Sequence, residues 1–138
     1  MEDLQKEFVP YELAVKLKAL GFDETCFGYY DHQIKKLDTI SSEVCERLCK
    51  HDTHIKAPTF SQAFRWFREN YGLLHELISC VENSWLITIV DLNSKSVNGV
   101  YMKRIDLDDI DENIPNTYEE AELACLDKLI EILENKID

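Results

Sequence analysis

Apolar and aromatic side chains recur at helical spacing along residues 59–71, with polar residues between them. Five of them occupy positions i, i+3, i+4, i+7 and i+11, which lie on one side of an α-helix. These residues are Phe60, Ala63, Phe64, Phe67 and Tyr71. The pattern predicts a helix that buries one aromatic stripe against a core.

Both ends of this helix carry their own signals. Thr59 and Gln62 have the T-x-x-Q spacing of a capping box, in which the hydroxyl and the amide each bond a free N–H of the first turn. Pro58 keeps the preceding chain extended, and Gly72 suits the left-handed position that follows a helix. The predicted helix therefore begins after Thr59 and ends before Gly72.

Two further segments show the same combination of end signals and an apolar face. Residues 9–21 open with Pro10, which a first helical turn accepts, and close with Gly21. Thr117 and Glu120 form a T-x-x-E capping box before a C-terminal amphipathic stretch. The expected inward faces comprise Leu13, Ala14, Leu17 and Leu20 in the first segment and Leu126, Leu129, Ile130 and Leu133 in the second.

Strand-like runs separate these helices. Residues 25–30 are short and aromatic, with Gly28 marking either a weak strand or a close approach of another group. Residues 74–81 and 85–91 have the spacing of a hairpin, and residues 100–105, after the turn dipeptide Asn98-Gly99, predict a third strand. Short connections favour antiparallel pairing.

The order of elements predicts an α+β fold: a small antiparallel sheet of about three to four strands with helices packed on one face. At 138 residues we expect a single domain over residues 1–138. Residues 31–56 carry a weaker pattern, and we interpret them as a variable insertion that contains a short helix near residues 40–49.

The net charge of the chain limits the kinds of molecule that it is expected to bind. The net charge is −12, from 27 acidic and 15 basic residues, and this disfavours direct nucleic-acid binding, which depends on Lys and Arg. The acidity serves either solubility or mimicry of nucleic acid towards a basic partner. A polar start, no apolar run of membrane-spanning length and five cysteines at irregular spacing predict a cytoplasmic protein with reduced thiols and no membrane contact.

Four candidate metal ligands lie within ten residues: Cys45, Cys49, His51 and His54. Zinc prefers sulfur and imidazole ligands, and cysteines at i and i+4 can point the same way from a helix. The spacing is tighter than structural zinc sites usually have, so the alternative is a buried cysteine pair beside exposed histidines. The sequence otherwise implies no cofactor.

No catalytic motif accompanies these residues. The chain lacks a P-loop, G-x-G-x-x-G, G-x-S-x-G and H-E-x-x-H. Cys26, Cys80 and Cys125 lie in apolar surroundings that suit inert thiols, and no histidine is placed beside them by a local signature. We therefore assign no catalytic residue.

Three residues of the central helix lie off its buried stripe and form a candidate binding face: Arg65, Trp66 and Arg68. Trp and Arg are common at interaction hot spots. The alternative is structural, with Trp66 covering the edge of the sheet and the arginines pairing with carboxylates. If folding gathered Lys103 and Arg104 beside them, the group would suit the phosphates of a nucleotide.

Three segments resemble a group of small uncharacterised proteins from phages, prophages and related bacterial genomes. The segments are EFVPYELA with LKALGFDE, then residues 57–73, then residues 117–132. The resemblance implies a mobile-element context and no catalytic residue, and residues 31–56 depart from the shorter connection typical of the group.

These observations predict a non-enzymatic, cytoplasmic accessory protein that binds another protein, with a homodimer as one form of that binding. A host-defence or regulatory factor with a basic surface is the expected type of partner. The alternatives are a small-ligand protein of the nucleotide-binding type and a zinc-stabilised protein built on Cys45, Cys49, His51 and His54.

Overall fold

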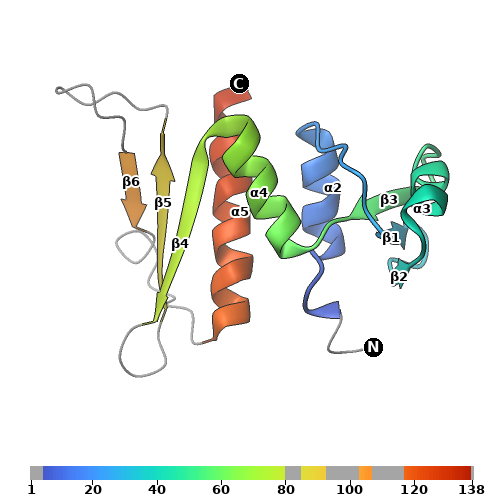
Figure 1. The fold of residues 1–138 in the computed structure, drawn as a ribbon, viewed down its shortest axis with the longest axis horizontal. Helices are drawn as coiled ribbons and strands as arrows, with labels where there is room; N and C mark the ends of the chain where they lie inside the picture. Colours follow the sequence, from blue (N-terminus) through green and yellow to red (C-terminus); the bar gives the residue numbers. More distant parts are fainter. Residues whose placement is uncertain (1–4, 80–84, 93–102, 107–116, 138) are drawn as a thin grey trace. The chain divides into compact units, whose positions relative to one another are not determined.

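A computed structural model describes residues 5–79, 85–92, 103–106 and 117–137 (Figure 1). The chain forms two compact units, residues 1–63 and 64–138, and we describe each by itself. The α+β class is confirmed, although the described strands form two three-stranded antiparallel sheets instead of one. A single domain with an insertion near residues 31–56 stays a prediction.

Unit 1 begins with helix α2, Tyr11–Ala19, as the pattern over residues 9–21 predicts. Pro10 is its N-cap, and three apolar residues of its inner face are buried. Gly21 has a φ of 103°, a conformation that suits glycine and turns the chain away from the helix axis. The buried residues are Leu13, Ala14 and Leu17.

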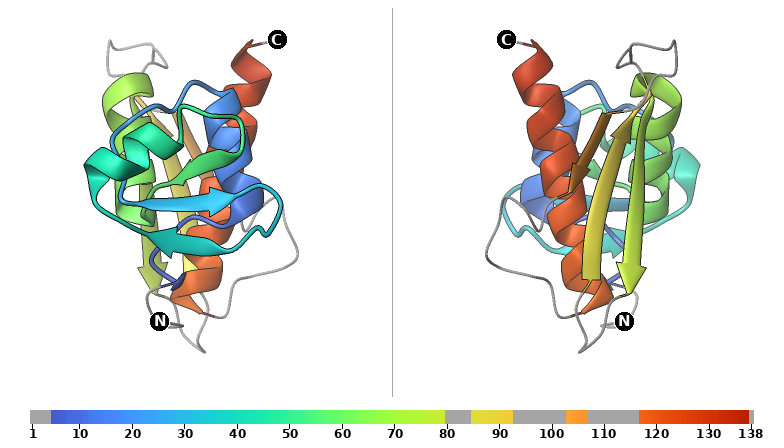
Figure 2. Two further views of the ribbon diagram at one scale, coloured as in Figure 1. Left: turned by 90° about the vertical axis from the view of Figure 1, so that its right-hand side faces the viewer. Right: turned by 90° about the vertical axis from the view of Figure 1, so that its left-hand side faces the viewer.

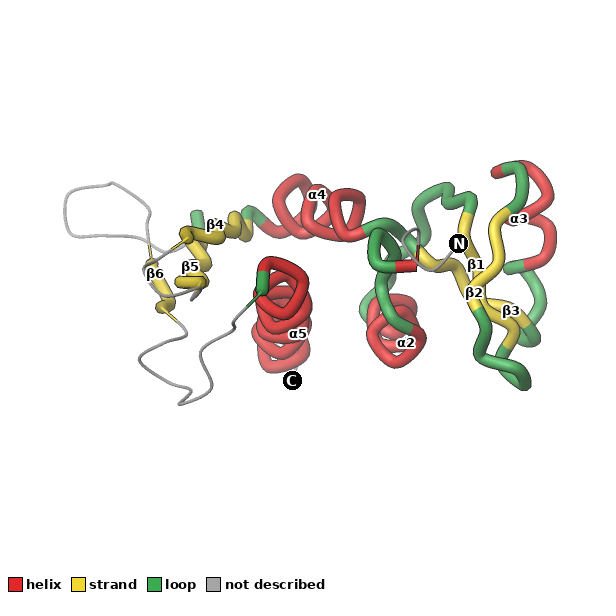
Figure 3. Tube along the Cα trace, turned by 90° about the horizontal axis from the view of Figure 1, so that it is seen from below, coloured by secondary structure: helices red, strands yellow, loops and turns green. Residues whose placement is uncertain are grey.

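The sheet of unit 1 has the strand order β2-β1-β3. Its strands are β1 (Gly28–Asp31), β2 (Leu37–Thr39) and β3 (His54–Ala57), and the short helix α3 (Ser42–Leu48) connects the last two. Figure 3 and the left view of Figure 2 show α2 and α3 on opposite faces of this sheet. The helix near residues 40–49 is confirmed, and residues 31–56 also contain β2 and most of β3.

The start of the chain pairs with the segment that leads into the central helix. Val9 N–H donates to the Pro58 carbonyl at 2.9 Å, and Phe60 N–H donates to the Glu7 carbonyl at 3.0 Å. The buried Tyr30 hydroxyl of β1 donates to the Val9 carbonyl at 2.8 Å. These bonds join the N-terminal segment to the sheet of unit 1.

Helix α4, Phe60–Tyr71, confirms the central prediction, and the boundary between the two units falls within it. Gln62 N–H donates to Thr59 Oγ1 at 3.2 Å, as the capping box requires. The Gln62 side chain does not reach back to Thr59, however, because its amide donates to the Thr25 carbonyl at 2.8 Å. Gly72, with a φ of 64°, ends the helix.

Unit 2 contains the sheet β4-β5-β6. The strands β4 (Leu73–Ser79) and β5 (Trp85–Asp91) form the predicted hairpin, and β6 (Lys103–Asp106) pairs antiparallel with β5. The last five residues of β5, the central strand of this sheet, are all buried. The predicted turn at Asn98-Gly99 lies outside the described residues.

Helix α5, Tyr118–Ile137, is the predicted C-terminal helix. Glu120 N–H donates to Thr117 Oγ1 at 3.1 Å, which confirms the second N-cap. The helix packs against β4 and β5 (Figure 2, right view). Leu126, Leu129, Ile130 and Leu133 are all buried. Across the described ranges, no helix combines the length and the apolar character needed to cross a bilayer.

Candidate functional site

An ion-pair triad lies at strand β3 of unit 1. Lys56 Nζ is 2.6 Å from Glu46 Oε1 of α3 and 3.0 Å from Asp23 Oδ1, while the Lys56 side chain is only 10% exposed. Burial opposes the ammonium charge, but the hydrogen bonds that Lys56 donates to Glu46 and Asp23 outweigh it and raise the pKa of Lys56. Lys56 therefore stays charged, which does not suit a nucleophile or base.

Two cysteine sulfurs meet beside this triad. Cys45 Sγ of α3 lies 3.9 Å from Cys49 Sγ of the helix C-cap and 3.5 Å from the Gly28 carbonyl. Burial is the main cause that raises the pKa of Cys45, and it raises the pKa of Cys49 to about 12. Both groups are accordingly thiols at neutral pH, which makes them poor nucleophiles.

A third sulfur, that of Cys26, lies in the same part of unit 1. It is within 3.5 Å of the Glu24 carbonyl and 3.6 Å of Gln62 Oε1, and burial with the nearby Cys45 raises its pKa to about 12. Cys125 in unit 2 is likewise buried, with a pKa raised to about 12 by burial and by Glu122. Cys80 lies outside the described residues.

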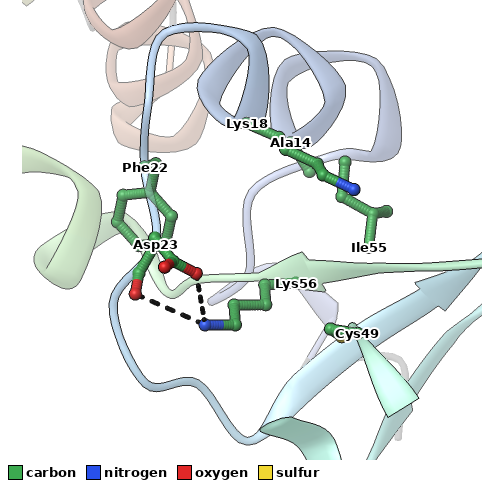
Figure 4. A pocket seen from close by; sticks show the side chains of 7 residues that line it. All are labelled: Ala14, Lys18, Phe22, Asp23, Cys49, Ile55 and Lys56. Carbon is green, nitrogen blue, oxygen red and sulfur yellow. Dashed lines mark hydrogen bonds and ion pairs between the residues drawn. The ribbon is translucent and has the colours of Figure 1, made fainter. Parts of the chain in front are cut away.

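A small cavity adjoins the triad and the cysteine pair. Its volume is about 40 Å³, which is far smaller than the clefts of roughly 300–1,000 Å³ that hold drug-sized ligands. Figure 4 shows Lys56 and Cys49 on one side of β3 and Ile55 with the α2 residues on the other. The cavity thus lies beside an edge strand and has room for water or an ion. It is lined by Ala14, Lys18, Phe22, Asp23, Cys49, Ile55 and Lys56.

The predicted four-residue zinc site is not assembled. Among the described residues, no three side chains of His, Cys, Asp or Glu are grouped so that they could hold a metal ion. Cys45 and Cys49 do meet, but His51 lies exposed in the turn after α3. His54 begins β3, where it is directed to the Thr53 hydroxyl at 2.8 Å and to Asp31, because β3 pairs there with β1.

The predicted binding face on α4 is also incomplete. Trp66 is only 5% exposed, with its ring edge-on to Phe67 and Tyr71 at centroid distances of 5.0 and 5.2 Å. The structural alternative for Trp66 is therefore better supported, because the ring is buried against two aromatic residues of the same helix. Arg65 and Arg68 occupy exposed positions of the same helix.

The remaining predicted cations belong to another element of unit 2. Lys103 and Arg104 are residues of β6, opposite Asp91 and Val90 of β5. β6 is the edge strand farthest from β4, the strand that follows α4 directly. The described geometry gives no contact that gathers these two residues with Arg65 and Arg68, so the phosphate-binding group stays a prediction.

A second feature of unit 1 is an exposed apolar pair at its sheet, which we term the Phe27–Ile40 patch. Phe27 is 50% exposed and Ile40 is 37% exposed. Ile40 N–H donates to the Phe27 carbonyl at 2.9 Å, which continues the pairing of Gly28 with Thr39 by one step. Below Phe27 lies the buried ring of Phe8, edge-on at 5.4 Å.

Sequence reasoning missed this patch and the Lys56 triad. Phe27 lies in a predicted strand, but β2 is only three residues long, which is too short to show a strand period. Lys56 directly precedes the Ala57-Pro58 step. The neighbouring sequence does not indicate its partners, because Glu46 and Asp23 lie 10 and 33 positions away. The local signal in the sequence is the alternation of polar and apolar residues over residues 54–57, which in β3 leaves Lys56 half-buried between the buried Ile55 and Ala57.

Comparison with family models, with curated proteins and with solved structures found no match to this chain.

Proposed function

We propose that this protein is a non-enzymatic, cytoplasmic accessory protein of phage type that binds a protein partner through the Phe27–Ile40 patch. The observation that carries the proposal is the exposure of two large apolar side chains on backbone held by a cross-strand hydrogen bond. Exposed apolar groups on rigid backbone lose little conformational freedom when a partner covers them.

The position of the patch favours an extended partner segment. β2 is an edge strand of its sheet, and the described part of the chain places no strand beyond it. An extended peptide can bond such an edge through its backbone while its side chains meet apolar groups on the sheet. Phe27 and Ile40 lie where such side chains would pack.

The charge of the chain favours a basic partner. A net charge of −12 attracts positive surfaces over long range and repels acidic ones. We therefore propose a basic protein segment, as in a host-defence or regulatory factor, and place self-association second. The cavity of about 40 Å³ gives a nucleotide-type ligand no comparable support.

A comparison of three proteins tests this function: the wild type, the F27S/I40S variant and the I34S variant. Ile34 is the matched control because it is 70% exposed but lies in the turn between β1 and β2, away from the patch. Proteins that the wild type and I34S capture from host cells, and F27S/I40S does not, are then purified and titrated by calorimetry.

We expect a purified partner to bind F27S/I40S at least about tenfold more weakly than wild type, with affinity that falls as salt rises. Equal affinity for wild type and F27S/I40S contradicts the proposal. A concentration-dependent homodimer that F27S/I40S abolishes, with no basic partner found, assigns the patch to self-association and contradicts the basic partner.

A further inference from the structure

The cysteine pair of unit 1 has a separation that suits a metal ion. Zinc–thiolate bonds are about 2.3 Å long, so two sulfurs at adjacent corners of a tetrahedron lie about 3.8 Å apart. Cys45 Sγ and Cys49 Sγ are 3.9 Å apart. The pair thus spans two corners of a tetrahedral site before any ion is bound, and little side-chain motion is needed.

The surroundings of the pair allow access for an ion and its water ligands. Cys45 is fully buried, but Cys49 is half-buried and lines the cavity of about 40 Å³. A water molecule in the liquid has a share of about 30 Å³, so the cavity has room for water next to Cys49. Cys49 lines the cavity and Cys45 does not, so water ligands would reach an ion at this pair from the Cys49 side.

The charged groups around the pair and its cavity balance before an ion binds. Asp23 and Glu46 carry two negative charges, and Lys56 and the cavity residue Lys18 carry two positive ones. Deprotonation of the two thiols would therefore supply the charge that balances a divalent ion.

We propose that Cys45 and Cys49 form a binding site for an exchangeable thiophilic divalent ion of the Zn²⁺ or Cd²⁺ type, with water completing the coordination. Two protein ligands are fewer than the three or four of resident zinc sites. The ion is therefore acquired and released by the folded protein, and it is not required for folding. Each binding event converts two thiols to thiolates, forms two metal–sulfur bonds and releases two protons.

Cadmium alone is the probe, because a thiolate bound to Cd²⁺ has a characteristic ultraviolet charge-transfer absorption. We expect the reduced wild-type protein to bind one Cd²⁺ with this absorption and to release two protons per ion in a weakly buffered titration. Wild-type protein that shows no charge-transfer absorption, or that releases no protons, overturns the proposal without recourse to a variant.

Matched variants identify the ligands. C49A removes the half-buried sulfur and should weaken Cd²⁺ binding by about tenfold or more. C125A, which removes a buried sulfur of unit 2, and H51A/H54A, which removes the two histidines of the predicted zinc set, should each stay within about twofold of wild type. Unchanged binding by C49A, or a tenfold loss in C125A or H51A/H54A, overturns the assignment.

The readout is independent of the proposed partner binding. If F27S/I40S loses partner binding but retains Cd²⁺ binding, the Phe27–Ile40 patch and the cysteine pair are separate sites of unit 1. Circular dichroism checks the fold of C49A. If C49A does not fold, proton release by the wild type decides whether Cd²⁺ binds through thiolates.

Discussion

The ring of Phe8 occupies the space beside Gly28 where any other residue would carry its side chain. A Cβ built at Gly28 would lie 2.6 Å from Phe8 Cε1 and 2.9 Å from the Ala57 carbonyl oxygen. Gly28 is thus required in β1 because the N-terminal segment and β3 approach it closely, which confirms one of the two roles that the sequence suggested for it.

The Gly28→Ala variant should unfold more easily by about 1–3 kcal/mol, because an added methyl group forces Phe8 or the β3 backbone to move. Urea denaturation measures the change. The exposed neighbour on β2 provides a control, and Thr39→Ala should stay within about 0.5 kcal/mol of wild type. If Gly28→Ala costs no more than Thr39→Ala, the close approach is not a constraint.

The two threonine N-caps should contribute to stability where a third hydroxyl does not. Thr59 and Thr117 each accept a bond from the backbone of their helix, whereas Ser41 at the start of α3 makes no side-chain cap bond. We expect Thr59→Ala and Thr117→Ala each to cost about 1 kcal/mol, and Ser41→Ala markedly less. Chemical denaturation of the three variants checks this order, which an equal loss in all three would contradict.

Trp66 should behave as a core residue. Its ring is buried against Phe67 and Tyr71, so Trp66→Ala should destabilise the protein by about 3–5 kcal/mol. Glu69, exposed on the same helix, is the control, and Glu69→Ala should change stability by less than about 0.5 kcal/mol. A Trp66→Ala variant that retained wild-type stability would restore the interpretation of Trp66 as a surface group.

The two carboxylates of the Lys56 triad should differ in their effect. Glu46 is 2.6 Å from Lys56 and partly buried, whereas the Asp23 side chain is 90% exposed. Solvent screens an exposed pair, so Asp23→Asn should cost less than about 0.5 kcal/mol and Glu46→Gln about 1–2 kcal/mol. Thermal unfolding of both variants at pH 7 tests the order, and a larger loss in Asp23→Asn would reverse our account.

His75 should make stability depend on pH. Burial, together with the nearby Arg68 charge, lowers its pKa in the folded protein, where its ring stacks on Phe64 at 3.8 Å. The unfolded chain, with an ordinary pKa of about 6.5, then binds the proton more readily. The contribution of His75 is present above about pH 6.5 and is lost as the pH falls through the folded pKa.

Urea denaturation of wild type and His75→Gln at pH 7.5 and at pH 5 measures this effect. We expect the wild type to lose more stability than the variant over this interval, because only the wild type has the His75 ring to protonate. A nuclear magnetic resonance titration of the ring should give a pKa below about 6.5. Equal losses of stability in the two proteins, together with a ring pKa of about 6.5, would contradict the burial of His75.

The elements that the sequence predicted are those whose signals are local. These signals act within a few turns of chain: a threonine three residues before the N–H that it bonds, a glycine after a helix, and an apolar stripe at 3.6-residue spacing. Helices α2, α4 and α5 and the β4–β5 hairpin follow from such signals. The hydrogen bond from the Gln62 side chain back to Thr59 did not form, because the Gln62 amide donates to the carbonyl of Thr25, 37 residues away in the chain.

Tertiary structure alone decided the sites. β2 and β3 are three and four residues long, too short to display a period, and they exist because both pair with β1. That pairing turns His54 towards Asp31, separates it from the cysteine pair, and places Lys56 between Asp23 and Glu46. The sequence by itself determined the helices and their caps, since those depend on neighbours in the chain. Which side chains meet depended on strand register, since register is set by contacts between distant residues.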